Sequence, residues 1–223
     1  MEIKPIAYIE NDFTEKFGIP RQSGRAPSVL SKIIFTEDYK NPDFLRGIEE
    51  FSHLWLIFDF SKAHKEQVSP LIRPPRLGGN KKVGVFASRS PFRPNNLGLS
   101  SVKLISVEKG VLTVAGADLM SGTPIYDIKP YIPFTDCHTD AVGSYADQNK
   151  DYKLTVEIPN EILKEIPEDK LIPLKECLAD DPRPSYQDDE ERIYVMPFDN
   201  YEISFKVSNG VATIIKIITE GKD

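Results

Sequence analysis

The first two thirds of the chain carry short β-rich runs, several of which alternate apolar and polar residues as strands with one buried face do. The runs are Ile3–Ile9, Val29–Phe35, His53–Phe60, Val83–Ala87, Leu99–Val107, Val111–Ala117 and Ile125–Ile132. One short helix is expected after Asn41, which can cap it, because Pro42 suits a first helical turn. Since helices do not alternate regularly with these runs, the pattern favours a barrel or a sandwich over a doubly wound sheet.

The pattern changes after about Asn149. A helix capped by Asn160 is expected to end at Pro167, and a second helical stretch follows it. The apolar positions of the first helix are Ile162, Leu163 and Ile166, and the second stretch is Glu168–Leu178. Three strand-like runs complete the chain: Arg192–Phe198, then Tyr201–Val207 and Val211–Ile218 around an Asn209-Gly210 turn. We therefore expect one domain over residues 1–150 and a small α+β domain over residues 151–223.

Composition narrows the class of protein. With 223 residues, 40% of them hydrophobic, the chain is long enough for one good core with a small annex. It contains no run of about 18 apolar residues, and its first residues are charged, unlike a signal peptide. The two cysteines, Cys137 and Cys177, cannot form a disulfide framework. These features predict a cytoplasmic protein that does not enter a membrane.

The charge is unevenly distributed along the chain. A net charge of −6 argues at first against a nucleic-acid partner, because such binding neutralises phosphates with Lys and Arg. Residues 67–107, however, contain no Asp or Glu and seven basic residues: Arg73, Arg76, Lys81, Lys82, Arg89, Arg93 and Lys103. A second acid-free window, residues 16–36, contains Lys16, Arg21, Arg25 and Lys32. The two windows predict a basic face, although ordinary solvated lysines remain the alternative.

Two neighbouring segments have the composition of ligand-binding loops. Ser88–Ser100 places two Arg, two Pro and two Asn between expected strands, which predicts a stiff loop of specified shape. The alternative is a structural loop whose arginines only bind carbonyl groups. In Arg73–Asn80 a Gly-Gly pair allows close approach of a ligand, and flanking arginines could bind a phosphate or carboxylate, although Gly-Gly is more often only a turn.

A third segment, Asp118–Pro133, places Asp127 and Lys129 on one face of a strand by the period of two. This pair could serve chemistry or form only a salt bridge. The three histidines and two cysteines have no metal-ligand spacing, so we expect no metal site. The chain also lacks a Walker A loop, a G-x-S-x-G turn and a G-x-G-x-x-G loop after a strand.

At these residues the sequence resembles the TsaA-like (TrmO) family of tRNA methyltransferases. The strings that carry the resemblance are PRQ (20–22), RGIEEFSHLWLIF (46–58), RPPRLGGN (73–80), VGVFASRSPFRPNNLGLS (83–100), DLMSGTPIYDIKPYIP (118–133) and DPRPSY (181–186). They follow the family's order across nearly the whole chain. The resemblance implies a mainly β protein, an antiparallel β-barrel with a small α+β C-terminal domain, usually a homodimer.

The same resemblance implies a reaction and a cofactor. The family transfers a methyl group from S-adenosyl-L-methionine to N6 of threonylcarbamoyl-adenosine at position 37, in the anticodon loop of tRNA. The residues implied to hold the cofactor are Pro20, Arg21, Gln22, Ser61, Lys62, Arg89, Leu99, Asp118, Leu119, Met120 and Ser121. Residue types suggest the tRNA contacts, which are Arg73, Arg76, Lys81, Lys82, Arg93, Asn95, Arg183 and Tyr186.

The catalytic candidates follow from the chemistry of the implied reaction. An amide-like nitrogen is a poor nucleophile, so alignment in a water-poor site must supply most of the rate. Asp127 is our candidate proton acceptor, with Lys129 and Tyr131 beside it, and water is the alternative. Tyr126 or Tyr131 could stack on the base. Two rival functions remain, a methyltransferase of another nucleoside or small molecule and a nonenzymatic RNA-binding barrel.

Overall fold

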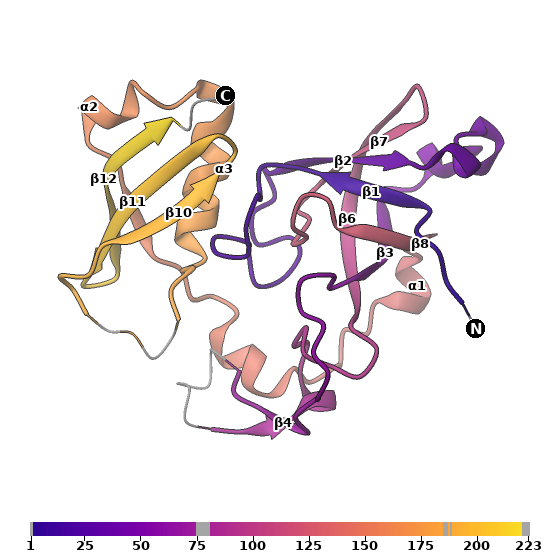
Figure 1. The fold of residues 1–223 in the computed structure, drawn as a ribbon, viewed down its shortest axis with the longest axis horizontal. Helices are drawn as coiled ribbons and strands as arrows, with labels where there is room; N and C mark the ends of the chain where they lie inside the picture. Colours follow the sequence, from indigo (N-terminus) through magenta and orange to yellow (C-terminus); the bar gives the residue numbers. More distant parts are fainter. Residues whose placement is uncertain (1, 75–80, 185–186, 188, 220–223) are drawn as a thin grey trace.

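The computed structural model describes residues 2–74, 81–184, 187 and 189–219. Its N-terminal part is a closed barrel with the strand order β1-β2-β7-β6-β3-β8 (Figure 1). The strands are β1 (Ala7–Glu10), β2 (Leu30–Phe35), β3 (His53–Asp59), β6 (Leu97–Glu108), β7 (Val111–Ala115) and β8 (Pro124–Pro130). Every neighbouring pair is antiparallel. The predicted antiparallel β-barrel is therefore confirmed.

The barrel core follows from the alternation of side chains along its strands. Leu54 and Leu56 of β3 are fully buried and pack with Ile33 of β2, Leu112 of β7 and Ile125 of β8. Burying side chains of this size contributes about 1.5–3 kcal/mol each relative to exposure, which makes one register of the strands strongly preferred. The residues between them in sequence point outward and form the outer face of the barrel.

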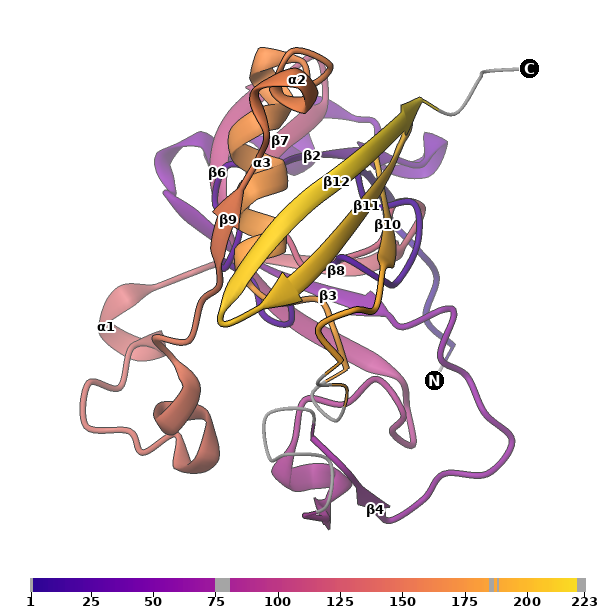
Figure 2. The same cartoon turned by 90° about the vertical axis from the view of Figure 1, so that its left-hand side faces the viewer.

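A second, smaller sheet lies beside the barrel (Figures 1 and 2). Its strand order is β10-β11-β12-β9, with helices α2 and α3 packed against it. The elements are β9 (Thr155–Glu157), α2 (Asn160–Leu163), α3 (Glu168–Ala179), β10 (Tyr194–Phe198), β11 (Tyr201–Ser208) and β12 (Val211–Thr219). Asn209 and Gly210 both adopt positive φ, as a two-residue hairpin turn requires. We refer to this part as the C-terminal unit.

The segment between β1 and β2 leaves the barrel and packs into the C-terminal unit. Phe13, Ala26 and Val29 are buried in the same cluster as the side chains of α3 and β10. The ring of Phe13 lies edge-on to Phe198, with 6.3 Å between ring centroids. Gly18 adopts a φ of +101°, and a Cβ there would lie 2.6 Å from a side-chain carbon of Met196. The two parts of the molecule therefore share a core through residues 13–29.

Short helices and one small hairpin connect these elements. They are η1 (Glu37–Tyr39), η2 (Pro42–Leu45), η3 (Ile48–Glu50), β4 (Leu71–Ile72), β5 (Val83–Gly84), η5 (Val85–Ala87), α1 (Pro133–Asp136) and η6 (Ser144–Asn149). The helix expected after Asn41 is present as a single 3-10 turn, in which the Asn41 side chain accepts a hydrogen bond from the backbone of Asp43. In the part of the chain that is described, no helix is long and apolar enough to cross a bilayer.

Two local predictions are wrong, and one strand was missed. Only Val83–Gly84 of the expected strand 83–87 pairs, because η5 follows at once. Pro159, not Asn160, occupies the N-cap of α2, which ends at Leu163 before Ile166. The chain also forms β9, a three-residue strand parallel to β12 that the sequence analysis missed, although Leu154–Ile158 alternates apolar and polar residues, because so short a run pairs only with a strand far away in the sequence.

Candidate active site

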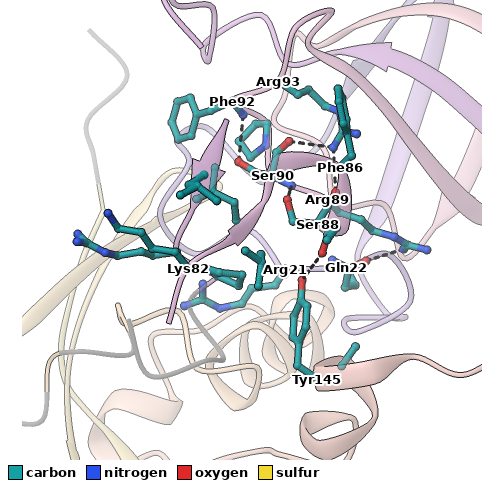
Figure 3. A pocket seen from close by; sticks show the side chains of 18 of the residues that line it. Arg21, Gln22, Lys82, Phe86, Ser88, Arg89, Ser90, Phe92, Arg93 and Tyr145 are labelled. Atoms are coloured by element: carbon teal, nitrogen blue, oxygen red, sulfur yellow. Dashed lines mark hydrogen bonds between the residues drawn. The ribbon is translucent and has the colours of Figure 1, made fainter. Parts of the chain in front are cut away.

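A cavity of about 1530 Å³ opens between the barrel, the β4–β5 hairpin and the C-terminal unit (Figure 3). Residues within 21–25, 63–74, 82–96 and 142–150 line it, together with Asp180 at the C-terminal end of α3. Two of the three segments singled out in the sequence, 73–80 and 88–100, therefore contribute to one site together with the acid-free window 16–36, whereas 118–133 contributes no lining residue. A cavity of this size can hold a cofactor and part of a second substrate.

The lining of the cavity is strongly basic. Its positively charged residues are Arg21, Arg25, Lys65, Arg73, Lys82, Arg89, Arg93 and Lys150. Among the described residues that line it, Asp180 is the one carboxylate, and Arg25 Nε lies 2.6 Å from its Oδ1. This excess of cations over carboxylates in the described lining concentrates the positive field in the cleft, although the whole chain carries a net charge of −6.

The loop 88–96 is fastened by its own side chains. Arg93 Nη1 donates to the carbonyl of Ser88 at 3.0 Å, and Asn96 Nδ2 donates to that of Pro91 at 2.8 Å. The Ser88 hydroxyl donates to the carbonyl of Val85 at 2.8 Å. The loop is therefore stiff, as the sequence predicts. Arg93 binds carbonyl groups, as in the structural alternative, whereas the exposed side chain of Arg89 reaches another loop.

Three of the implied cofactor-binding residues meet at one end of the barrel. Arg89 Nη1 donates to Gln22 Oε1 at 2.6 Å (Figure 3). Asp118 accepts a hydrogen bond of 2.6 Å from the Ser100 hydroxyl. Burial raises the pKa of the Asp118 carboxyl, while Ser100 and the charge of Arg89 act in the opposite direction. Gln22, Arg89 and Asp118 thus form one polar cluster built from three separate segments.

The turn at residues 118–121 is held by the end of β1. Asn11 Nδ2 donates to the carbonyl of Leu119 at 2.9 Å, and the backbone N–H of Ser121 donates to that of Phe13 at 2.8 Å. The carbonyl of Met120 accepts from Thr123 within the turn. Leu119 is buried. This arrangement fixes the backbone that follows Asp118.

The remaining cofactor candidates lie in different surroundings. Pro20 is buried and precedes Arg21, which lines the cavity. Ser61 and Lys62 are exposed, and Lys16 Nζ donates to the carbonyl of Lys62, which places this pair beside the segment that leads to Pro20. Leu99 is 55% exposed on β6, opposite Ile57 of β3, on the outer face of the barrel.

The catalytic candidates Asp127 and Lys129 lie on the outer face of β8, Tyr131 directly follows that strand, and none of the three lines the cavity. Lys129 Nζ lies 2.8 Å from Asp127 Oδ2, and both side chains are about half exposed. Their partners in β3 are Trp55 and Ile57. The ring of Tyr131 lies 5.4 Å from that of Trp55. Asp127 and Lys129 thus form the salt bridge that the sequence analysis gave as the alternative to a chemical role. The role of Asp127 as proton acceptor stays a prediction.

The tRNA-contact candidates divide into three groups. Arg73, Lys82 and Arg93 line the cavity, whereas Lys81 and Asn95 are exposed beside it. Arg183 Nε lies 2.8 Å from Asp181 Oδ1, and this hydrogen bond raises the pKa of Arg183. The Arg183 guanidinium is therefore already bound by a carboxylate of the protein itself. Arg76 and Tyr186 lie outside the described residues.

Aromatic residues in the cavity were missed by the sequence analysis, which proposed Tyr126 and Tyr131 for stacking. The lining contains Phe86, Phe92 and Tyr145. Phe86 is 79% exposed, and Lys65 Nζ lies 4.1 Å from the centroid of the Phe92 ring. Tyr145 Oη donates to the carbonyl of Ala87 at 3.4 Å. The two phenylalanines stand in the string VGVFASRSPFRPNN, so their interleaving with arginines was the available signal.

Metal ligands do not gather in the described part of the protein, where no group of three or more His, Cys, Asp or Glu side chains could hold an ion. Cys137 is exposed and Cys177 is buried, and both are free thiols. The arrangement of side chains is therefore that of a basic, aromatic cleft beside a polar cluster. Such a cleft suits an anionic ligand with planar rings.

Comparison with known proteins assigns the chain to a family. Residues 8–137 match the tRNA-methyltransferase O N-terminal domain, and residues 151–220 match the TrmO C-terminal domain. The tRNA (adenine(37)-N6)-methyltransferase of Escherichia coli (strain K12) is 37% identical over 221 residues, 93% of this chain and 94% of that protein. The protein of the same name from Eikenella corrodens is 46% identical over 168 residues, 74% of this chain and 95% of that protein.

Solved structures give the same relationship. A crystal structure of TrmO from Pseudomonas aeruginosa has a TM-score of 0.81 and 30% sequence identity, covering 98% of this chain and 97% of that one. The matches of sequence and of structure both extend over the barrel and the C-terminal unit. The chain therefore belongs to the tRNA-methyltransferase O family.

Proposed function

We propose that the protein is an S-adenosyl-L-methionine-dependent methyltransferase that modifies N6 of threonylcarbamoyl-adenosine at position 37 of tRNA. The observation that carries the proposal is the basic cavity, whose described lining contains eight cationic residues and one carboxylate, that of Asp180, which is paired with Arg25. Polyanionic RNA is the substrate class that this charge favours. The names of the relatives from Escherichia coli and Eikenella corrodens, both tRNA (adenine(37)-N6)-methyltransferases, support methylation of N6 of adenine 37.

The cluster of Gln22, Arg89 and Asp118 fits the proposed cofactor. S-adenosylmethionine carries an ammonium group, a carboxylate and ribose hydroxyls, which need both acceptors and cationic donors. The Asp118 carboxylate is an acceptor for the ammonium or a hydroxyl, and Arg89 is a cationic donor for the carboxylate. When bound, the cofactor supplies an electrophilic methyl group.

The residues around the cavity would align the nucleoside. The threonylcarbamoyl group carries a carboxylate, for which Arg73 and Lys82 are candidate partners because both line the cavity. Phe86 offers an exposed ring for an unpaired base of the anticodon loop. A base in a loop is already unpaired, so bringing it to the cleft costs little. Holding the weak N6 nucleophile in place would supply most of the rate.

The reaction also requires an acceptor for the N6 proton. Asp127 remains our proposed acceptor, with Lys129 beside it on β8 and Tyr131 directly after the end of that strand. Since these side chains lie on the outer face of the barrel, their participation requires that face to border the bound nucleoside. A second subunit is one way to complete such a site, and we propose a homodimer that works in the cytoplasm. The exposed Leu97 and Leu99 of the same face support an apolar contact.

Mass spectrometry of nucleosides tests the function. tRNA with and without the threonylcarbamoyl group is incubated with the protein and S-adenosylmethionine, then digested. A mass gain of one methyl group on the threonylcarbamoyl nucleoside alone supports the proposal. Methylation of tRNA that lacks the threonylcarbamoyl group would show that the proposed substrate is wrong. Calorimetric titration with S-adenosylhomocysteine separates the remaining rival, because a nonenzymatic RNA-binding barrel gives no saturable heat. Sedimentation of the protein tests the dimer.

A further inference from the structure

The loop at residues 21–25 is fastened to the C-terminal unit by one carboxylate. Asp180 lies at the C-terminal end of α3 and accepts two hydrogen bonds from this loop. Arg25 Nε donates to its Oδ1 at 2.6 Å, and the backbone N–H of Arg21 donates to its Oδ2 at 3.1 Å. The side chains of Arg25 and Asp180 are only 22% and 5% exposed. Both oxygens of a buried carboxylate are thus used on a loop far away in the sequence.

The same guanidinium joins a third segment to this contact. Arg25 Nη1 donates to the carbonyl of Lys150 at 2.5 Å, and Nη2 donates to that of Tyr152 at 2.7 Å. Lys150, Arg25 and Asp180 all line the cavity. Gly24, between the two arginines, donates its N–H to the carbonyl of Gly116 at 2.8 Å. The loop is therefore held between the barrel and the C-terminal unit.

The position of this loop determines the polar cluster at the proposed cofactor site. Gln22 lies between Arg21 and Arg25 and accepts the hydrogen bond from Arg89. The backbone of Ser23 contributes a hydrogen bond to Asp118. A shift of residues 21–25 would displace the partner of Arg89 and one partner of Asp118 together. Asp180 itself bonds to neither Gln22, Arg89 nor Asp118 in the contacts described.

We propose that Asp180 is a positioning residue, which holds the 21–25 loop in the conformation that binds the cofactor and so couples the C-terminal unit to the methyl-transfer site. This inference rests on the proposed function, since the cofactor is assigned to the same loop. It gives the C-terminal unit a role at the cofactor site that is separate from any contact with RNA. The physical cause is that a charged hydrogen bond at each oxygen restricts the loop more than neutral contacts would.

A second ion pair between the two parts provides a matched control. Lys170 Nζ of α3 lies 2.5 Å from Asp12 Oδ1, with side chains 22% and 16% exposed. It fastens the C-terminal unit to the end of β1 and touches no residue of 21–25 in the contacts described. Lys170→Gln therefore weakens the junction of the two parts without removing a hydrogen bond from the loop. A loss of cofactor affinity through general loosening would appear in this variant as well.

The experiment is calorimetric titration of S-adenosylhomocysteine into the wild type, Asp180→Asn, Arg25→Gln, their combination and Lys170→Gln, each checked for folding by circular dichroism. We expect a loss of affinity of about ten-fold for Asp180→Asn and for Arg25→Gln, within the usual range of coupling between sites, and little change for Lys170→Gln. Because both substitutions break the same Arg25–Asp180 ion pair, the double variant should lose less affinity than the sum of the two single losses.

The possible results separate the two proposals. If the wild type does not bind S-adenosylhomocysteine, the proposed function fails. If it binds and a folded Asp180→Asn binds equally well, the positioning role is wrong. Equal losses in Asp180→Asn and Lys170→Gln, or additive losses in the double variant, also overturn it. If Asp180→Asn does not fold, Arg25→Gln tests the same ion pair by a substitution in the 21–25 loop. In that variant the KM for the cofactor should rise, while kcat at saturating cofactor stays near that of the wild type.

Discussion

The Ser100 hydroxyl donates a hydrogen bond of 2.6 Å to Asp118 Oδ1, and so ties the strand β6 to the turn that follows β7. Despite this bond, burial raises the pKa of Asp118 above its ordinary value. The fold therefore favours the neutral carboxyl relative to the unfolded chain. Its contribution to stability is present at pH values below the ordinary pKa of 3.8 and is lost as the pH rises through the raised value.

Asp118→Asn should consequently be more stable than the wild type at pH 7, because the amide is never charged and still accepts from Ser100. The difference should shrink as the pH falls below the raised pKa. Urea denaturation at pH 7 and pH 4 measures it, with the exposed Asp140→Asn as control. The same variant should bind S-adenosylhomocysteine more weakly, because the Asp118 carboxyl, which lowers stability at pH 7, is proposed to contact the cofactor. Lower stability of Asp118→Asn at pH 7 would contradict the argument.

Arg89 and Arg93 stand in one loop but should respond differently to truncation. Arg89 is exposed and bonds to Gln22, whereas Arg93 donates to the backbone of its own loop. Arg89→Ala should therefore lose most methyl transfer with little loss of stability. Arg93→Ala should lose about 1 kcal/mol of unfolding free energy, the usual net value of a hydrogen bond. Single-turnover rates and thermal denaturation of both variants check this. Unchanged turnover in a folded Arg89→Ala would exclude its place at the cofactor.

The strand pattern and the Asn209-Gly210 turn could be predicted from the sequence because both depend on neighbours in the chain. Alternation placed every strand of the barrel to within a few residues, apart from the start of β1. The packing of residues 13–29 against α3 could not be predicted, because Phe13 and Phe198 are brought together only by tertiary structure. The resemblance supplied the candidate cofactor residues, and the local pattern did not.

The site shows the same division. The sequence predicted that the arginines in Ser88–Ser100 bind a ligand. It does not say which of them forms hydrogen bonds within the loop itself. The structure separates them, because Arg93 reaches the carbonyl of Ser88 and Arg89 does not. Likewise Arg183 was expected to face tRNA, whereas its ion pair with Asp181 turns it inward. Such assignments need the geometry of the folded chain.

Phe86 should contribute to RNA binding through stacking. Its ring is 79% exposed in a basic cavity, and base–aromatic stacking is worth about 1–3 kcal/mol per base. Phe86→Ala should weaken tRNA binding by that amount, while Phe86→Trp should retain it. Phe44, 62% exposed on η2 outside the cavity lining, gives the control Phe44→Ala. Filter-binding titrations measure the effect. An equal change in both alanine variants would show that Phe86 acts only as exposed apolar surface.

Lys81 and Lys82 allow a test of where the RNA backbone runs. The two are adjacent and both exposed, but Lys82 lines the cavity and Lys81 does not. Each phosphate neutralised by a lysine releases counterions, so the logarithm of affinity falls with the logarithm of salt by about 0.7 per contact on single strands. Lys82→Gln should therefore lower this slope by about 0.7, whereas Lys81→Gln should leave it nearly unchanged.

Titrations of tRNA at several potassium chloride concentrations give the slope for the wild type and both variants. Affinity for S-adenosylhomocysteine, measured without tRNA, should stay the same in each, because neither lysine belongs to the proposed cofactor cluster. If Lys81→Gln and Lys82→Gln lower the slope equally, the backbone passes over the whole exposed edge of the hairpin rather than through the cavity. If neither changes it, the phosphates are bound by other cations, and the cavity holds only the base and its carboxylate.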